Sequence, residues 1–522
     1  MRWQLPAPRC LFFALSKFLH HLMAHYIDYH DHLSVLHVAP TQPPGQRQMQ
    51  QIAHIYIDGR FVAPHGTELF DLHDPTTGDV FGQVRLGDVH DARAAIAAAK
   101  RAFPAWSRSS KADRIDLLRR LHQAMDARKD ALRDAIILEY GAPIARATWM
   151  AGHAASSFLD AAHALQGFDL TQPIGTAEVI MEPVGVVGLI TPWNSNAGFI
   201  CNKLAYALAA GCTAVIKPSE MSAAQTHVVL EALHAAGAPA GLFNIVNGRG
   251  DVVGAEITEN PDIAKISFTG STAVGKAIVR AAADTLKRVT LELGGKSPTI
   301  ILDDADFAKA MPIALEAGFA NSGQACVAGT RILIPASRFD EAIAAVRNAL
   351  KTIVAGNPRD PATTIGPMVS QAQYDRVQRY IRLGIEAGAT LVAGGEGHPD
   401  GLGGYFVKPT IFANVTNDMR ISREEIFGPV LCLLTYEDEA EAISIANDTP
   451  YGLQAYVISA SVDRAAAVAK RIEAGRVVIN GAPHDPAAPF GGFKQSGIGR
   501  DYGVFGLQAY LEPKALLGAQ SA

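Results

Sequence analysis

Between residues 184 and 293 the chain alternates short apolar runs with helix-favouring stretches, and no other feature limits the possible folds as strongly. Each apolar run is expected to form a strand, and the runs cover residues 186–191, 213–216, 243–246 and 265–268. The stretch between the first two runs ends at Gly211 and is expected to be a helix over residues 199–210. Strands and helices that alternate in this way predict parallel βαβ units. Such sheets bind ligands at the carboxyl ends of their strands.

Helix signals occur on both sides of the first strand. Asp88 is placed to cap a helix that ends before Pro104, and Ser222 is placed to cap one that ends before Gly237. Residues 111–132 repeat apolar side chains at helical spacing, which predicts a further helix.

A second α/β series follows in the other half of the chain. Strands are expected at residues 331–334, 430–436 and 477–479, and helices at 339–354 and 462–473. The length of 522 residues suits several domains. The pattern therefore predicts two α/β lobes, with a boundary near residues 293–300.

Composition and charge exclude several classes of function. About half of the residues are hydrophobic, at 48%, so large cores are possible. The formal charge is -5 and no long basic run occurs, so neither nucleic acid nor a membrane surface is an expected partner. The five cysteines include no CxxC pair, so no metal site is expected, and a reducing, cytoplasmic location fits best.

Residues 1–48 differ from the rest of the chain. The apolar stretch at residues 10–28 is interrupted by Lys17 and three histidines, so neither a membrane span nor a cleaved signal peptide is expected. We expect residues 1–48 to be an extension that is disordered or not native, with Met49 as a candidate start. A protein that becomes insoluble or inactive when they are deleted would contradict this expectation.

Two short motifs suggest a nucleotide site, and a third is rejected. In FTGSTAVG, Gly270 and Gly275 lie between a predicted strand and a predicted helix, where backbone N–H groups can meet a phosphate. In KPSE, Lys217 and Glu220 follow a strand, where an acidic group can bind ribose hydroxyls and repel a 2′-phosphate. Each motif alone fits an ordinary loop equally well. GGKS resembles the end of an ATP-binding P-loop, but Thr290 stands where the first glycine belongs.

The lone cysteine in NSGQACVAGT, Cys326, has two interpretations. Free cysteines are mostly buried core residues, so a small apolar side chain is one. A nucleophile in a loop is the other. Gly323 and Gly329 flank it at three residues on either side, and we expect them to let backbone and cofactor approach the sulfur.

Taken together, these motifs resemble those of the NAD(P)-dependent aldehyde dehydrogenase superfamily. The resemblance covers residues 52–518 and depends on seven motifs in the family's order: TPWN, KPSE, FTGSTAVG, LELGGKSP, GQACVAGTR, EEIFGPV and PFGGFKQSGIGRD. It implies Cys326 as the nucleophile, Glu292 as the general base and Asn194 as an oxyanion donor. Lys203 and Asp501 match positions associated with a proton relay behind the base.

The resemblance also implies a coenzyme site and a substrate pocket. NAD is the expected coenzyme, with Glu220 disfavouring NADP. The positions expected to contact it are Thr191, Pro192, Trp193, Lys217, Ser219, Glu220, Gly250, Gly270, Ser271, Gly275, Leu293, Gly294, Glu425 and Phe427. The positions expected to line the pocket for a small-molecule aldehyde are Ser195, Phe199, Asn202, Ala325, Val327, His484 and Phe490. Ser195 and Asn202 replace bulky side chains that are frequent in the family, which implies a roomier and more polar tunnel.

The fold implied by the resemblance is an α/β fold of the aldehyde dehydrogenase type. It has a Rossmann-like NAD-binding domain, an α/β catalytic domain and a small β oligomerisation extension. We assign residues 49–164 and 184–293 to the first, 294–500 to the second, and 165–183 with 501–518 to the third. The extension implies a homodimer or homotetramer.

The implied reaction is oxidation of an aldehyde to a carboxylic acid through a thiohemiacetal and a thioester on Cys326. Thiolate addition produces an oxyanion that can expel hydride, and a carboxylate such as Glu292 can then activate water. Two alternatives stay open. One is a coenzyme A-acylating or NADP-preferring semialdehyde dehydrogenase, and the other is a catalytically silent binding or structural member of the fold.

Overall fold

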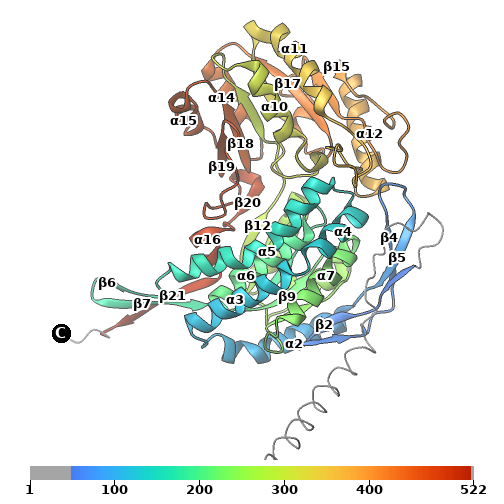
Figure 1. The fold of residues 1–522 in the computed structure, drawn as a ribbon. Coiled ribbons are helices and arrows are strands. Elements are labelled where there is room, and N and C mark those ends of the chain that lie inside the picture. The colour runs from blue at the N-terminus through green and yellow to red at the C-terminus, as the bar shows by residue number, and fades with distance from the viewer. Residues whose placement is uncertain (1–48, 519–522) are drawn as a thin grey trace, which may run out of the picture. The chain divides into compact units, whose positions relative to one another are not determined.

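The computed structural model describes residues 49–518, so the predicted extension at residues 1–48 lies outside the described residues. Two α/β sheets and two smaller sheets organise this part of the chain (Figure 1). None of the helices between residues 49 and 518 is both long enough and apolar enough to cross a bilayer.

The larger sheet has eight strands. Their order is β20 (Gly497–Ile498), β12 (Arg288–Glu292), β11 (Lys265–Thr269), β8 (Val186–Ile190), β9 (Thr213–Lys217), β10 (Phe243–Ile245), β2 (Ile55–Ile57) and β3 (Arg60–Val62). The five central strands are parallel, and β20 and the β2–β3 hairpin add antiparallel edges. The four strands predicted between residues 184 and 293 are confirmed. The strand order reverses between β8 and β11, which is where a ligand crevice forms in such sheets.

Helices connect and cover these strands. They are α2 (Val89–Trp106), α3 (Lys111–Asp126), α4 (Lys129–Tyr140), α5 (Ile144–Gln166), α6 (Asn196–Ala210), α7 (Ala223–Ala235), α8 (Ala255–Glu259) and α9 (Thr272–Ala283). Asp88 caps α2 as predicted, because its carboxylate accepts hydrogen bonds from the N–H groups of His90 and Asp91. Helix α2 nevertheless continues past Pro104, which lies in its last turn and costs the helix one N–H···O=C bond, to the carbonyl of Lys100.

Two further helix predictions need correction. The helix predicted over residues 111–132 is interrupted at Arg128, whose backbone leaves the helical region (φ -112°, ψ 10°), so α4 starts separately and packs against α7. Ser222 stands at the start of α7 without capping it. The carboxylate of Glu139 on α4 accepts hydrogen bonds from the N–H groups of Ala224 and Gln225 instead, at 2.8 and 3.0 Å. Burial raises the pKa of Glu139 to about 8.

The second α/β sheet has seven strands and confirms the later predicted strands, whereas the helices predicted over residues 339–354 and 462–473 end earlier, at Ala349 and Ala469. Their order is β15 (Thr390–Ala393), β16 (Thr410–Ala413), β17 (Val430–Tyr436), β14 (Arg331–Pro335), β13 (Pro298–Ile301), β18 (Gln454–Ile458) and β19 (Arg476–Ile479), and only β15 is antiparallel. Its helices include α10 (Phe307–Gly318), α11 (Phe339–Ala349), α12 (Gln371–Glu386), α13 (Arg420–Arg423), α14 (Glu439–Asn447) and α15 (Val462–Ala469). Aliphatic and aromatic side chains fill the core on both of its faces.

Two three-stranded sheets complete the described chain. One joins β1 (Gln50–Ile52), β5 (Val80–Arg85) and β4 (Leu69–His73). The other joins β6 (Thr171–Ile174), β7 (Ala177–Pro183) and β21 (Leu511–Leu517), which follows α16 (Gly503–Gln508) (Figure 1). This sheet therefore pairs the two segments that the sequence assigns to oligomerisation. The domain boundaries themselves stay predictions.

Candidate active site

Cys326 lies in a loop of unusual backbone geometry between α10 and β14. Three consecutive residues, Asn321, Ser322 and Gly323, adopt the left-handed region, with φ of 55°, 58° and 74°. A Cβ on Gly323 would lie 2.2 Å from the carbonyl oxygen of Gly428, and a Cβ on Gly329 would meet the side chain of Thr299 at 2.3 Å. Both glycines thus face protein atoms. Packing of the loop against its own chain therefore requires both glycines, and the expectation that they also let the cofactor approach the sulfur stays a prediction.

Asn194 is hydrogen-bonded to this loop. Its side-chain Nδ2 donates to the carbonyl oxygen of Gln324 at 3.0 Å, and Asn321 Nδ2 donates to the carbonyl oxygen of Asn194 at 3.0 Å. Asn194 follows β8 and is buried. These reciprocal bonds hold its amide two residues from Cys326, with a second N–H left for another acceptor.

The Cys326 thiol is held in its neutral form. The residue is partly exposed, but burial raises its pKa to about 12, and the nearby carboxyl groups of Glu425 and Glu292 raise it further. A thiol with this pKa carries almost no thiolate at neutral pH. Attack by this sulfur therefore needs a base or an added positive charge.

Glu292 presents an unpaired carboxyl group at the carboxyl end of β12. Among the described residues, neither of its side-chain oxygens has a hydrogen-bond partner, although both are buried. Burial first, and then the charge of Asp501, raise its pKa well above the usual value, whereas Lys203 and Arg500 oppose the shift. Gly491 lies directly beside it, since a Cβ there would stand 2.7 Å from Oε1. Such a carboxyl group can bind a water molecule and accept its proton.

Lys203 and Asp501 form a buried ion pair near Glu292. Lys203 Nζ lies 2.9 Å from Asp501 Oδ2 and 2.8 Å from Ser267 Oγ. Both charged residues are buried, which is costly unless they are paired and hydrogen-bonded. The structure thus brings together all five residues that the sequence assigns to catalysis.

The predicted coenzyme residues gather at the carboxyl edge of the eight-stranded sheet. They follow β8, β9, β10, β11 and β12, or precede β17: Thr191, Pro192, Trp193, Lys217, Ser219, Glu220, Gly250, Gly270, Ser271, Gly275, Leu293, Gly294, Glu425 and Phe427. Lys217 Nζ lies 3.1 Å from Glu220 Oε2, and Glu425 Oε1 accepts from the N–H of Gly295 at 2.9 Å. Ser271 uses its hydroxyl to cap α9. A Cβ on Gly250 would meet no atom within 4 Å, so the chain leaves open space there.

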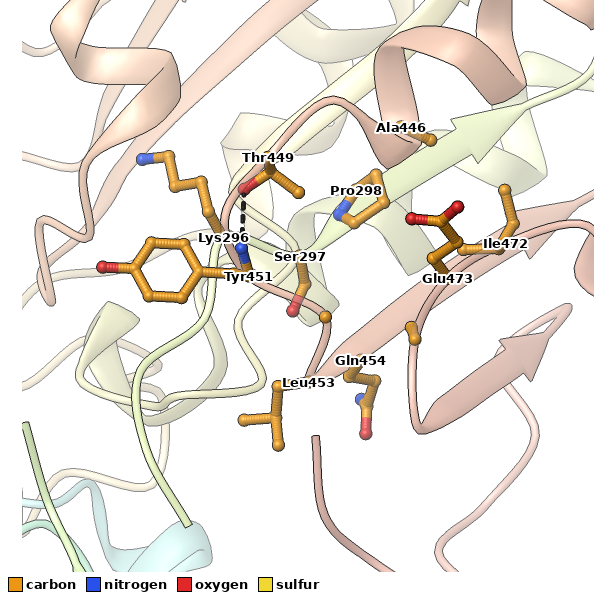
Figure 2. Close-up of a pocket in the computed structure, with 12 residues that line it drawn as sticks. Lys296, Ser297, Pro298, Ala446, Thr449, Tyr451, Leu453, Gln454, Ile472 and Glu473 are labelled. Atoms are coloured by element: carbon orange, nitrogen blue, oxygen red, sulfur yellow. Dashed lines mark hydrogen bonds between the residues drawn. The ribbon is translucent and has the colours of Figure 1, made fainter. Parts of the chain in front are cut away.

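The GGKS stretch that follows Glu292 and Leu293 is packed inside the protein. Lys296 and Ser297 are both buried, and Lys296 Nζ and Ser297 Oγ have no partner among the described residues. Figure 2 shows the Lys296 side chain pointing away from Ser297. Ser297 borders a water-sized cavity of about 10 Å³.

The predicted substrate residues lie on three segments. Ser195, Phe199 and Asn202 belong to the start and first turns of α6, Ala325 and Val327 flank Cys326, and His484 and Phe490 lie in the loop before β20. Asn202 is buried, and its Nδ2 has no partner within residues 49–518. This amide therefore keeps a free hydrogen-bond donor, and its place in the substrate tunnel stays a prediction.

Sequence reasoning named His484 and Phe490 but missed the rings of Trp149, His153 and Tyr502 that cluster with them. His153 on α5 stacks on Trp149, with centroids 4.9 Å apart, and its Nε2 lies 3.2 Å from the Tyr502 hydroxyl. Tyr502 meets the rings of His484 and Phe490 edge-on. A Cβ built on Gly198 would lie 3.6 Å from His153 Cδ2 and 3.0 Å from Ser195 Oγ, so His153 and Ser195 lie close together. One sequence signal could have suggested this cluster: Tyr502 directly follows Asp501. His153 carries no such signal, because it stands alone in an alanine-rich helix.

The two histidines of this cluster are uncharged at neutral pH. Burial lowers the pKa of both His153 and His484 to about 4, helped at His484 by the charge of Arg476. Arg476 Nη1 lies 3.1 Å from His484 Nδ1. Among the described residues, no group of three or more His, Cys, Asp or Glu side chains is arranged to hold a metal ion.

Comparison with known proteins identifies the family. The model of the Aldehyde dehydrogenase family matches residues 61–516. The chain belongs to the aldehyde dehydrogenase family. It is 46% identical to a 3-succinoylsemialdehyde-pyridine dehydrogenase from a Pseudomonas species, over 91% of this chain and 100% of that protein.

Solved structures show the same fold. A mutant aldehyde dehydrogenase C from Pseudomonas syringae, in complex with NAD+ and octanal, is 44% identical, with a TM-score of 0.88 over 92% of this chain and 99% of that one. An Escherichia coli NADP-dependent enzyme is 37% identical, with a TM-score of 0.86 over 89% and 98%. The predicted family and α/β fold of this aldehyde dehydrogenase are confirmed, and it is an oxidoreductase of aldehydes.

Proposed function

We propose that this aldehyde dehydrogenase oxidises its substrate to a carboxylic acid with NAD, through a thiohemiacetal and then a thioester on Cys326. The carboxyl group of Glu292 supports this most directly. Its two oxygens are buried without partners in the described chain, and its charge affects the Cys326 thiol. A carboxylate with free lone pairs beside a nucleophile can activate the water that hydrolyses a thioester.

The first half-reaction is attack of the Cys326 sulfur on the aldehyde carbon. The thiol must lose its proton as the C–S bond forms, and Glu292, the nearby carboxyl group whose oxygens have no partner in the described chain, can take it. The oxyanion that develops accepts hydrogen bonds from the Asn194 amide and the Cys326 backbone N–H, and one such donor is worth about 10²–10³ in rate. Bound NAD supplies the acceptor for the hydride.

The second half-reaction is hydrolysis of the thioester. Glu292 removes a proton from water as the oxygen attacks the acyl carbon, and the Cys326 sulfur leaves. Before this step Glu292 must release the proton that it took from Cys326, and Lys203 and Asp501, which lie near Glu292, are proposed to relay that proton to solvent. Because burial raises the pKa of Glu292, this step accelerates as pH rises through that pKa.

The coenzyme site fits NAD. Open space beside Gly250 lets the backbone approach a diphosphate, and the Lys217–Glu220 pair can hold a ribose diol. Glu425, held on the Gly295 N–H, can bind the second ribose. The Pseudomonas syringae relative contains NAD+, which agrees with this assignment, whereas the E. coli relative uses NADP. A Glu220→Gln variant should gain activity with NADP relative to NAD, and an unchanged ratio would contradict the role of Glu220.

The main experiment measures NADH formation and the product across a panel of aldehydes. Wild-type protein should release the free acid even when coenzyme A is present. Cys326→Ala should form no NADH, and turnover by that variant would overturn the mechanism. Glu292→Gln should give at most one NADH per active site and then stop. An acyl-coenzyme A product would favour the acylating alternative, and no activity at all would favour a silent member of the fold.

The substrate class follows from the residues near the tunnel. Asn202 and Ser195 offer polar groups, and uncharged His153 and His484 lie beside the rings of Tyr502 and Phe490. We propose an oxygenated or ring-substituted aromatic aldehyde. One relative is named 3-succinoylsemialdehyde-pyridine dehydrogenase, and this name includes pyridine, an aromatic ring.

A broad panel of aldehydes tests this substrate class. Benzaldehyde- and pyridine-type aldehydes should exceed octanal in kcat/KM. The preference should fall in Ser195→Phe and Asn202→Trp, because their side chains fill the tunnel. An unchanged ranking in both variants would contradict the proposal.

We also propose a cytoplasmic homodimer or homotetramer. All four cysteines between residues 49 and 518 are free thiols, which suits a reducing compartment. Strand β6 is exposed along its whole length at the edge of a small sheet, and such an edge can be covered by a second subunit.

A further inference from the structure

Four ionisable side chains are buried together behind the reacting groups. The exposed fractions are 1% for Glu292, 1% for Lys203, 5% for Asp501 and 2% for Lys265. Lys265, on β11, is the one member to which the mechanism gives no role. Its burial calls for an explanation, because a charged lysine inside a protein is costly unless its charge is compensated.

The contacts of Lys265 tie it to the Lys203–Asp501 pair. Lys265 Nζ donates to Thr290 Oγ1 at 2.7 Å, and it lies 5.1 Å from the centroid of the Tyr510 ring. Lys265 and Ser267 are two residues apart on one strand, so their side chains point to the same face of the sheet. Ser267 Oγ is also the acceptor of the Lys203 ammonium, at 2.8 Å.

No carboxylate forms a direct ion pair with Lys265 among the described residues. The titratable groups that face it are Asp501, Lys203, Cys212 and Arg288, together with the phenol of Tyr510. Cys212 is a buried thiol whose raised pKa keeps it neutral. Arg288 is paired with Glu512.

The charges of the four buried groups balance only in certain states. With both lysines protonated and Asp501 ionised, the cluster carries one excess positive charge, which ionisation of Glu292 cancels. If Lys265 is neutral, ionised Glu292 instead leaves one excess negative charge among these four groups, with the half-buried Arg500 as the remaining positive charge that acts on Glu292. Ionising the base is thus easier when Lys265 is charged.

We propose that Lys265 is a positioning residue for the base: its buried ammonium, beside the Lys203–Asp501 pair, adds a positive charge that favours the ionised form of Glu292. This inference rests on the proposed function of Glu292. Lys265 does not touch the substrate, and no proton needs to pass through it. Its contribution is the charge that it places behind the pair.

The titration of Lys265 predicts how its effect on Glu292 depends on pH. Burial lowers its pKa to about 8, while the charge of Asp501 opposes that shift. Below this pH the wild-type cluster holds the Lys265 charge, and above it the charge is lost. Removing the lysine should therefore matter at pH 6–7 and cease to matter above about pH 9.

The test measures how fast the acyl adduct on Cys326 is hydrolysed. Single turnovers of full-length protein are quenched at successive times, and mass spectrometry measures the fraction of protein that still carries the adduct. In Lys265→Met the rate should fall by about three- to tenfold at pH 6–7, equivalent to about 0.5–1 pKa unit at Glu292. It should match the wild type above pH 9. A rate unchanged at every pH, or lowered equally at every pH, would overturn the proposal.

Two further variants keep the test decisive. Lys287→Met removes another buried lysine, one bonded to the backbone carbonyls of Asn260 and Ile263 and outside the cluster, so its pH profile should match the wild type. A pH-dependent loss in this control would also overturn the proposal. If Lys265→Met does not fold, Thr290→Val removes only the acceptor of the Lys265 ammonium. It should lower the rate at pH 7 and leave it unchanged at pH 9.

The Glu292→Gln variant distinguishes a failure of the proposed function from a failure of the proposed role of Lys265. If that variant hydrolyses its adduct at the wild-type rate, the proposed function itself fails. If it is blocked while Lys265→Met retains the wild-type pH profile, the base stands and only the role of Lys265 is wrong.

Discussion

At the scale of the residue, function depends on groups that the protein keeps neutral. Burial raises the pKa of both the Cys326 thiol and the Glu292 carboxyl, so neither is in its reactive form at rest. Perturbed groups of this kind cluster at functional sites. The resting site therefore resists modification, and reaction requires proton transfer after the substrate enters.

Alkylation of Cys326 in the protein without coenzyme should follow this titration. With iodoacetamide, the rate should be slow at pH 7 and still rise by about tenfold per pH unit between pH 8 and 10, because the thiolate fraction rises by that factor below the pKa. Peptide mass spectrometry identifies the modified cysteine. The fully buried Cys201 and Cys432 serve as internal references that stay unmodified in folded protein. A rate that levels off near pH 7 would show an activated thiol instead.

At the scale of the element, loops between strands and helices carry the site. The loop before β14 turns through three left-handed residues, and Gly323 lies against Gly428 with no room for a side chain. Asn194 then joins this loop to the end of β8. The two α/β sheets are thereby connected two residues before Cys326, the proposed nucleophile.

Gly323→Ala should disable the enzyme without unfolding it. A Cβ 2.2 Å from the Gly428 oxygen, at φ +74°, forces the loop to shift, and a shift of about 1 Å in a catalytic group can cost 10²-fold in rate. We expect kcat to fall by at least about tenfold. Gly152→Ala is the matched control, because Gly152 is helical and a Cβ there meets no atom within 4 Å. Equal activity of both variants would contradict the constraint.

At the scale of the molecule, the small sheet of β6, β7 and β21 connects distant parts of the chain. β21 pairs with β7 from Leu511 to Leu517, and Tyr510, just before β21, faces the buried Lys265. The C-terminal segment thus borders both the proposed subunit contact and the proposed support of the base.

Removing residues 511–522 should therefore break the assembly. Without β21, strand β7 loses its partner along seven residue pairs, and the sheet that we propose as the subunit contact loses one strand. Light scattering after gel filtration should show a smaller species than the wild type. A chain lacking only residues 519–522 should retain the wild-type mass. An unchanged mass in both would place the subunit contact elsewhere.

Local patterns in the sequence determined the order of strands and helices, and the motifs implied the candidate residues of the site. Alternating apolar runs predicted the parallel strands, because strand and helix periodicity are local properties of a sequence. The motif order predicted the family, and the structure brings Cys326, Glu292 and Asn194 together as those motifs imply. Local signals failed where a residue distant in sequence makes the contact. At the start of α7, the carboxylate of Glu139 accepts the backbone hydrogen bond that Ser222 was predicted to accept.

Only the tertiary structure decided how the site is charged and what surrounds it. The pKa of each buried group depends on burial and on neighbours far away in sequence, such as Lys203 beside Asp501. His153 and Tyr502 meet only because α5 packs beside α16 and the segment before it. Lys265 joins the buried cluster for the same reason: strand pairing and packing, rather than sequence spacing, set the distances over which charges act.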